Sequence, residues 1–170
     1  MAPLVILVLV TLVLAGLRAM GVGRVPAWPF AVQGGVAAMF TATGMAHFIG
    51  MREELIAMVP PVVPAPELVI TVTGLLELAG AAGVLWHRTA PWAAAGLTAM
   101  LVGMFPANVY AAIKGISPAF GDALVPRTLM QLVFLAATVT VLVHHLRTRR
   151  APANQQVAAG SLDPAQSMSV

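Results

Sequence analysis

Long apolar runs separated by short polar connections dominate this chain. The runs cover residues 1–17, 26–50, 68–86, 90–113 and 128–143. Each is close to the roughly 20 residues that a helix needs to cross a bilayer. The runs lack the alternation of a strand, and an open sheet could not satisfy its backbone hydrogen bonds in lipid. The pattern therefore predicts an all-α integral membrane protein with five transmembrane helices.

The first run is compatible with a signal peptide or with a first transmembrane helix. A signal peptide carries basic residues before its apolar core and a small-residue cleavage site after it. Here Arg18 and Arg24 follow the run, and no Lys or Arg precedes it. We therefore expect an uncleaved helix, a signal anchor over residues 1–20, with the N-terminus outside.

The rest of the chain divides into a bundle and a tail. Residues 26–145 hold the other four runs, whereas residues 151–170 are rich in Ala, Gln, Ser and Pro and are expected to form a disordered cytoplasmic tail. Basic residues favour the inner side of this topology, as the positive-inside rule requires. Arg18, Arg24, Arg88, Arg147, Arg149 and Arg150 fall inside, and Arg52, Lys114 and Arg127 fall outside.

The outer connection between the second and third runs contains a short amphipathic segment, residues 52–59. Leu55, Met58 and Val59 share one face, and the prolines that follow end the helix. Such a helix could rest on the lipid headgroups. It could also be a lid over the outer mouth of the bundle, and the sequence leaves both interpretations open.

Composition supports the membrane assignment and narrows the chemistry. Hydrophobic residues make up 59% of the chain and charged residues 9%, against roughly 25% charged residues in soluble domains. No basic stripe alternates with aromatic residues, so nucleic acid is not an expected partner. The chain has no cysteine, so we expect no disulfide and no iron–sulfur cluster. A haem is not expected either, since His47 has no second His at similar depth; no metal site is predicted.

The polar residues inside the runs define a candidate site. Glu77 lies near the bilayer midplane, where a carboxylate costs about 2.5–3.5 kcal/mol. His47, Asn108, Arg127 and Gln131 all fall in the outer half, and the inner halves hold almost no polar residue. We therefore predict a polar pocket that opens outward, in which Arg127 could pair with Glu77. Each residue also has a structural interpretation, as an interhelical hydrogen bond, a helix-kink partner or an interface anchor.

Five short motifs occur in a characteristic order. They are His47-Phe48, Met58-Val-Pro-Pro-x-x-Pro64, Gly74-x-x-Glu77-x-x-Gly80, Phe105-Pro-Ala-Asn108 and Arg127-x-x-x-Gln131. Together they resemble the DoxX-like family of small bacterial membrane proteins, over about residues 28–145. The resemblance implies that the second to fifth helices form a four-helix membrane bundle in the bacterial inner membrane. The additional first helix and the long tail depart from that family.

The resemblance and the candidate pocket together suggest a function. The family name derives from a subunit associated with a thiosulfate:quinone oxidoreductase, which implies an accessory subunit beside a membrane redox partner. The pocket would then hold a small lipophilic ligand such as a quinone, and the chain would not be an enzyme on its own. The alternatives are a structural or assembly protein without a ligand and a small transporter. The sequence leaves the oligomeric state open, including a homo-oligomer.

Overall fold

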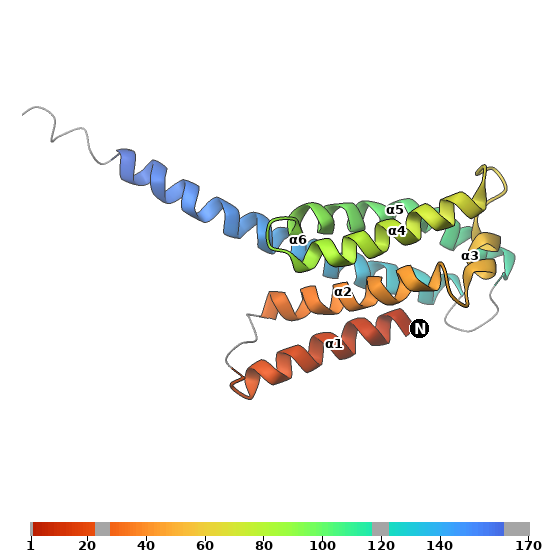
Figure 1. Ribbon diagram of the computed structural model, residues 1–170, viewed down its shortest axis with the longest axis horizontal. Coiled ribbons are helices and arrows are strands. Elements are labelled where there is room, and N and C mark those ends of the chain that lie inside the picture. The colour runs from red at the N-terminus through yellow and green to blue at the C-terminus, as the bar shows by residue number, and fades with distance from the viewer. Residues whose placement is uncertain (1, 23–27, 117–122, 162–170) are drawn as a thin grey trace, which may run out of the picture.

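The computed structural model describes residues 2–22, 28–116 and 123–161, with side chains as far as residue 149 (Figure 1). These residues form six helices and no strand. The helices are α1 Ala2–Ala19, α2 Trp28–Ala46, α3 Arg52–Met58, α4 Pro66–Leu85, α5 Ala90–Lys114 and α6 Leu124–Ser161. The all-α prediction is confirmed.

Four of the helices are long and apolar enough to cross a membrane: α1, α4, α5 and the part of α6 up to Arg149. Four apolar helices of this length indicate a multi-pass membrane protein. The second predicted span, α2, is not among them. Its sequence includes Trp28, Gln33, two threonines and three glycines, which lower its hydropathy. It lies between α1, α4 and α6, and a helix covered by other helices has less need of an apolar surface.

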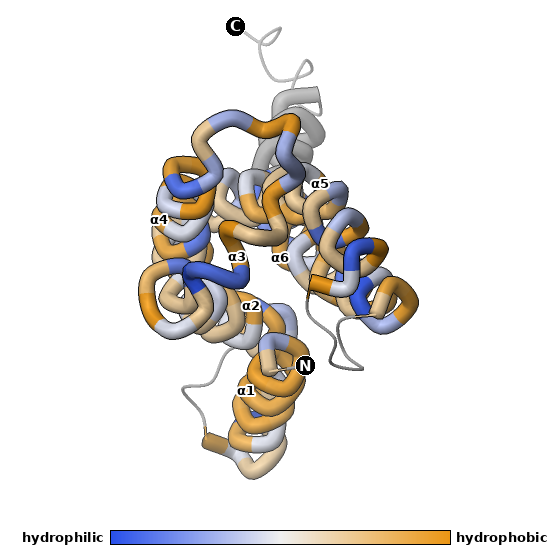
Figure 2. The backbone as a smooth tube through the Cα atoms, turned by 90° about the vertical axis from the view of Figure 1, so that its right-hand side faces the viewer, coloured by the Kyte–Doolittle hydropathy of each residue, from blue (hydrophilic) through white to orange (hydrophobic). Residues whose placement is uncertain are grey.

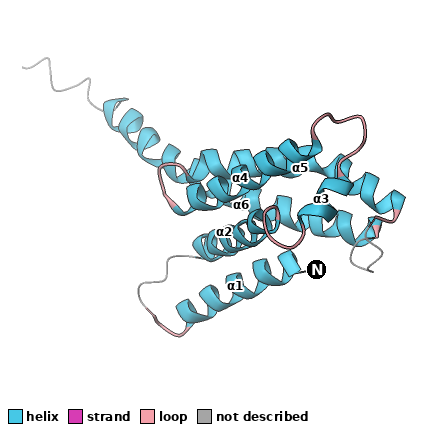
Figure 3. Cartoon of the chain, turned by 45° about the vertical axis from the view of Figure 1, so that its right-hand side comes forward, coloured by secondary structure: helices cyan, strands magenta, loops and turns pink. Residues whose placement is uncertain are grey.

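Four helices form a closed ring, and a fifth lies beside it. Contacts join α2 to α4, α4 to α5, α5 to α6, and α6 back to α2. The first helix packs on the outer side of α2, as the end-on view shows (Figure 2). The short α3 lies across one end of the ring, where it contacts α4 and α5 (Figure 3). We call this the α3 end.

Small residues set the closest helix contacts. A Cβ atom added at Gly74 of α4 would lie 2.6 Å from the His47 Cβ atom, and one added at Gly44 of α2 would lie 2.9 Å from the Leu78 side chain. A Cβ atom at Gly35 would lie 2.8 Å from the Leu7 carbonyl of α1. Close approach at small residues is the usual way in which membrane helices pack, because lipid supplies no hydrophobic drive between them.

The apolar core fills the middle of the ring. Val36, Met39 and Phe40 of α2 pack with Val84 of α4, and all four side chains are at most 2% exposed. Many large apolar side chains on the outer faces are exposed instead, among them Leu76 and Val102. An apolar outer surface of this kind suits contact with lipid.

The helix α5 runs through Pro106, because neighbouring groups can satisfy the backbone around a membrane proline. The last helix continues to Ser161, although the sequence predicts a disordered tail from residue 151. This segment contains several alanines, which have high helix propensity. Residues 162–170 of the predicted tail, and Arg24 and Asp122, lie outside the described residues.

Candidate functional site

The α2–α4 interface holds a buried acid–base pair. Glu77 projects from the middle of α4, and His47 follows directly after the last residue of α2. The His47 Nδ1 atom lies 3.9 Å from the Glu77 Oε2 atom, and the two residues are 2% and 4% exposed. Added Cβ atoms at Gly74 would contact His47, and those at Gly44 would contact Glu77 and Leu78, so the pair sits at a close contact of the two helices.

One hydrogen bond fixes the tautomer of His47. Its Nδ1 atom lies 2.9 Å from the Thr43 carbonyl oxygen one turn earlier. A carbonyl oxygen only accepts, so Nδ1 carries a proton and donates it. In a neutral ring the Nε2 atom is then an acceptor; in a charged ring it is a second donor. The Thr43 hydroxyl also lies close enough to the Glu77 carboxyl group to interact with it.

Both members of the pair have one buried atom without a hydrogen-bond partner among the described residues. These atoms are His47 Nε2 and Glu77 Oε2. Leaving a buried polar atom unsatisfied costs about 1–3 kcal/mol, and most buried polar groups in proteins do have partners. The pair therefore offers two open hydrogen-bonding positions in an otherwise apolar interface.

Arg52, the first residue of α3, forms hydrogen bonds to groups near the pair. Arg52 Nη1 donates to the His47 carbonyl oxygen at 3.2 Å. Its Nη2 atom donates to the Thr71 hydroxyl at 3.0 Å and to the Glu67 carbonyl oxygen at 3.4 Å. Arg52 thus connects the first residue of α3 to the end of α2 and the first turns of α4. This arrangement holds α3 across one end of the ring.

The other predicted site residues lie between α5 and α6. Arg127 Nη1 donates to the Asn108 Oδ1 atom at 2.9 Å, and Asn108 Nδ2 donates to the Met104 carbonyl oxygen at 3.4 Å. Gln131 is buried, and its Nε2 atom donates to the Leu101 carbonyl oxygen at 2.6 Å. The Asn108 and Gln131 side chains thus donate to backbone carbonyl oxygens of α5 in the turns before Pro106.

The structure therefore divides the predicted set into two groups. His47 and Glu77 meet between α2 and α4, whereas Asn108, Arg127 and Gln131 meet between α5 and α6. The expected Glu77–Arg127 pair is not among the described interactions; Glu77 pairs with His47 instead. Two apolar grooves of about 290 and 620 Å³ run along α1 and α6, and none of the five predicted residues lines either of them.

Gln131 belongs to a row of buried polar residues on α6, of which the sequence-based site included neither Thr138 nor His145. Gln131, Thr138 and His145 follow one another at seven-residue intervals, and all three are buried. Thr98 of α5 donates to the Thr138 hydroxyl at 2.9 Å, and His145 Nε2 lies 2.9 Å from the Gln33 Oε1 atom of α2. We call Gln131, Thr138 and His145 the α6 seam. Its seven-residue spacing was the signal that could have revealed it.

The seam corrects the expectation that the inner halves lack polar residues. Gln33 and His145 are buried near the end opposite α3, and Gln33 Nε2 also donates to the Val84 carbonyl oxygen of α4. Successive seam levels are seven residues apart, or about 10 Å along the helix. This separation is too long for direct hydrogen bonds between levels, so the described seam residues form no continuous hydrogen-bonded path across the ring.

Comparison with known protein families gives a match over the middle of the chain. The family model described as Domain of unknown function (DUF8561) matches residues 36–127. This range contains the His47–Glu77 pair, α3 and the Asn108–Arg127 pair, and it ends before Gln131. No curated protein and no solved structure matches the chain.

Proposed function

This chain belongs to the DUF8561 family, and we propose that it holds a small lipid-soluble molecule of the quinone class at the His47–Glu77 pair. In this proposal the chain is an accessory subunit of a membrane redox system. A redox partner in the membrane supplies the electrons, and this chain supplies the binding site and a proton-accepting or proton-donating group.

One observation carries the proposal: the two open positions at His47 Nε2 and Glu77 Oε2. A ligand that carries oxygen atoms can satisfy them. A hydroxyl group can donate to the Nε2 atom of a neutral His47 or to the Glu77 carboxylate, and a carbonyl oxygen can accept from a charged His47 or from a protonated Glu77. A quinone carries carbonyl oxygens and its quinol carries hydroxyl groups, so the pair can form hydrogen bonds with both forms of that ligand class.

The apolar surroundings support a lipophilic ligand over a water-soluble one. Small-molecule sites are mostly apolar, with a few placed polar groups that fix orientation. Here the α2 and α4 helices supply an apolar interface around one acid–base pair. In this proposal α3 and the Arg52 hydrogen bonds cover the site from the α3 end.

We further propose that α2 is a fifth span, which makes the ring of α2, α4, α5 and α6 a DoxX-like four-helix bundle. The closed order of contacts around the ring supports this assignment. The chain would lie in a bacterial inner membrane with its N-terminus outside and its C-terminus in the cytoplasm. The α3 end, where Glu53, Glu54 and Glu67 lie, would then face outward.

A direct binding measurement tests the proposal. The full chain is purified in mild detergent and equilibrated with a short-chain ubiquinone, and bound ligand is measured by dialysis and native mass spectrometry. We expect saturable binding by the wild type and a loss of about 10- to 100-fold in affinity for Glu77→Gln, the worth of a hydrogen bond to a charged group. His47→Leu should show a similar loss.

Glu67→Gln is the matched control, because it makes the same chemical change on the same helix at an exposed position. It should bind like the wild type. Absence of saturable binding by the wild type, or equal affinity in wild type and Glu77→Gln, would contradict the proposal.

A structural role is the second candidate, and one observation favours it. The pair lies at a close contact of α2 and α4, beside Gly44 and Gly74, so it could serve to fix the position of the two helices. A structural pair should lose stability when Glu77 is changed to Gln, in the absence of any ligand. The binding and stability measurements therefore separate the two functions.

A further inference from the structure

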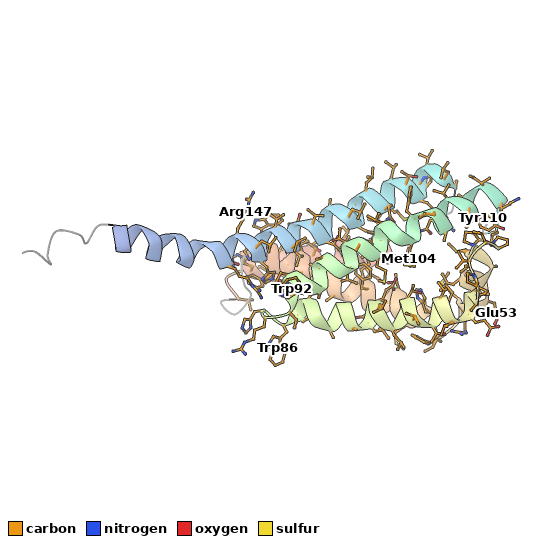
Figure 4. All side chains as sticks on the ribbon, turned by 90° about the horizontal axis from the view of Figure 1, so that it is seen from above. Glu53, Trp86, Trp92, Met104, Tyr110 and Arg147 are labelled. Carbon is orange, nitrogen blue, oxygen red and sulfur yellow. The ribbon has the colours of Figure 1, made fainter. Side chains whose placement is uncertain are left out.

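The end of the ring opposite α3 gathers arginines from separate elements. Arg88 lies in the α4–α5 turn, and Arg147 and Arg149 lie on α6 where it leaves the ring; all three are exposed. In Figure 4 the Arg147 side chain lies at the same end as Trp86 and Trp92, far from Glu53 and Tyr110 at the α3 end. We call Arg88, Arg147 and Arg149 the basic end.

A hydrogen-bonded link joins the two elements of the basic end. Arg149 Nη2 donates to the Arg88 carbonyl oxygen at 2.6 Å and to the His87 carbonyl oxygen at 3.3 Å. The link holds the α4–α5 turn against α6 and brings the two chain positions that carry Arg88 and Arg149 together. Like charges that are held close together repel one another, and an anion between them relieves that repulsion.

The described part of the chain offers no acidic group to fill that role. Its acidic residues are Glu53 and Glu54 on α3, Glu67 in the first turn of α4, and Glu77 inside the ring. The charge distribution is therefore polarised: the acids lie toward the α3 end and the basic end lacks a described acidic partner. An anion from the surroundings would complement it.

Tryptophans locate the basic end at a membrane surface. The chain has three tryptophans, and Trp28, Trp86 and Trp92 are 63%, 64% and 76% exposed. All three lie at helix termini or turns at this end: the first residue of α2, the residue after α4, and the first turn of α5. Exposed tryptophans are typical of the headgroup region, where their rings contact both lipid and water. The anions closest to such rings are lipid phosphates.

We propose that the basic end is a binding surface for the phosphate headgroups of anionic phospholipids, which it prefers over zwitterionic ones. Arg88, Arg147 and Arg149 supply the charge, and the tryptophans set the depth. Juxtamembrane arginines attract anionic lipid with an effect that corresponds to about fivefold in binding for each charge.

The tryptophans give a site-specific test, because all of them lie at the basic end. The full chain is reconstituted in phosphatidylcholine vesicles that contain brominated phosphatidylglycerol or, in parallel, brominated phosphatidylcholine, and quenching of tryptophan fluorescence is compared. We expect stronger quenching by phosphatidylglycerol in the wild type. Arg88→Gln and Arg147→Gln should each lower its relative binding constant by about fivefold.

Lys114→Gln is the matched control, because it removes one exposed positive charge from the last turn of α5, at the α3 end. It should keep the wild-type preference.

The Arg88→Gln change leaves the Arg88 carbonyl available to Arg149, so the turn should stay folded, and an unchanged unfolding midpoint checks this. Inorganic phosphate at the ionic strength of a chloride control should leave the quenching unchanged, whereas displacement of the lipid by free phosphate would overturn the headgroup assignment. Equal quenching by the two lipids in the wild type, or an unchanged preference in Arg88→Gln with Arg147→Gln, would also overturn the proposal.

Discussion

The α6 seam and the α2–α4 pair both place polar side chains inside an apolar ring, yet their hydrogen bonding differs. In the seam, Gln131 bonds to Leu101, Thr138 to Thr98 and His145 to Gln33. In the pair, His47 Nε2 and Glu77 Oε2 have no hydrogen-bond partner among the described residues. The polar side chains of the seam are thus matched, in that each has a hydrogen-bond partner, whereas each member of the pair has an atom without one.

This difference separates two reasons for burying a polar group. A matched group fixes how helices fit together, because a shift along the helix axis would break its bonds. An unmatched group destabilises the fold, and proteins commonly retain such groups for function. Removing a polar group should therefore lower stability in the seam but not at the pair, and three variants test the comparison.

The largest expected effect comes from the contact that supports the pair. Gly74→Ala would place a Cβ atom 2.6 Å from the His47 Cβ atom, and such overpacking costs about 1–3 kcal/mol. We expect a clearly lower unfolding midpoint in detergent. Gly103→Ala is the control, since an added Cβ atom meets nothing within 4 Å there, and Ala favours a helix over Gly by about 0.5–1 kcal/mol. Equal midpoints for the two variants would show that the α2–α4 contact is looser than described.

A loss of the same order is expected in the seam. Gln33→Leu removes the partner of His145 and the donor to the Val84 carbonyl oxygen, and each unsatisfied group costs about 1–3 kcal/mol. Stability should fall by about 2 kcal/mol in a denaturant titration. The double variant Gln33→Leu with His145→Leu should lose less than the sum of the single losses, because the two residues share one bond. Strict additivity would show that the bond contributes nothing.

The smallest effect is expected for Glu77. Because its Oε2 atom has no described hydrogen-bond partner, Glu77→Gln should leave the unfolding midpoint in the ligand-free protein unchanged or higher, within about 0.5 kcal/mol. Glu67→Gln serves again as the control. A loss of stability in Glu77→Gln comparable to that of Gln33→Leu would indicate that the pair has a structural role.

The sequence predicted the helices well because apolar length is a local property. The expected runs 68–86 and 90–113 correspond closely to α4 and α5, and the amphipathic segment 52–59 corresponds to α3. The association of the helices depends on which faces meet, and hydropathy does not contain that information. For this reason α2 was expected as an ordinary span, although it is the helix with ring neighbours on one side and α1 on the other.

The candidate site was predictable in part for the same reason. The depth of Glu77 and His47 follows from counting residues along two helices, and the structure places them together. The contacts of Arg127 depend on the rotation of α5 and α6, and they include a hydrogen bond to Asn108. Gln33 and His145 were overlooked because they lie 112 positions apart and only the closure of the ring joins them.

The position of α1 outside the ring has a consequence for how the chain can be labelled. An even number of helices returns a chain to the side where it started, so the ring alone would begin and end on one side. The additional helix makes α1 begin near the α3 end, while α6 leaves at the other end (Figure 1). In the proposed five-span topology, fusion tags placed before α1 and after α6 would stand on opposite sides of the membrane, and a reporter that is active in only one compartment would work on one of them.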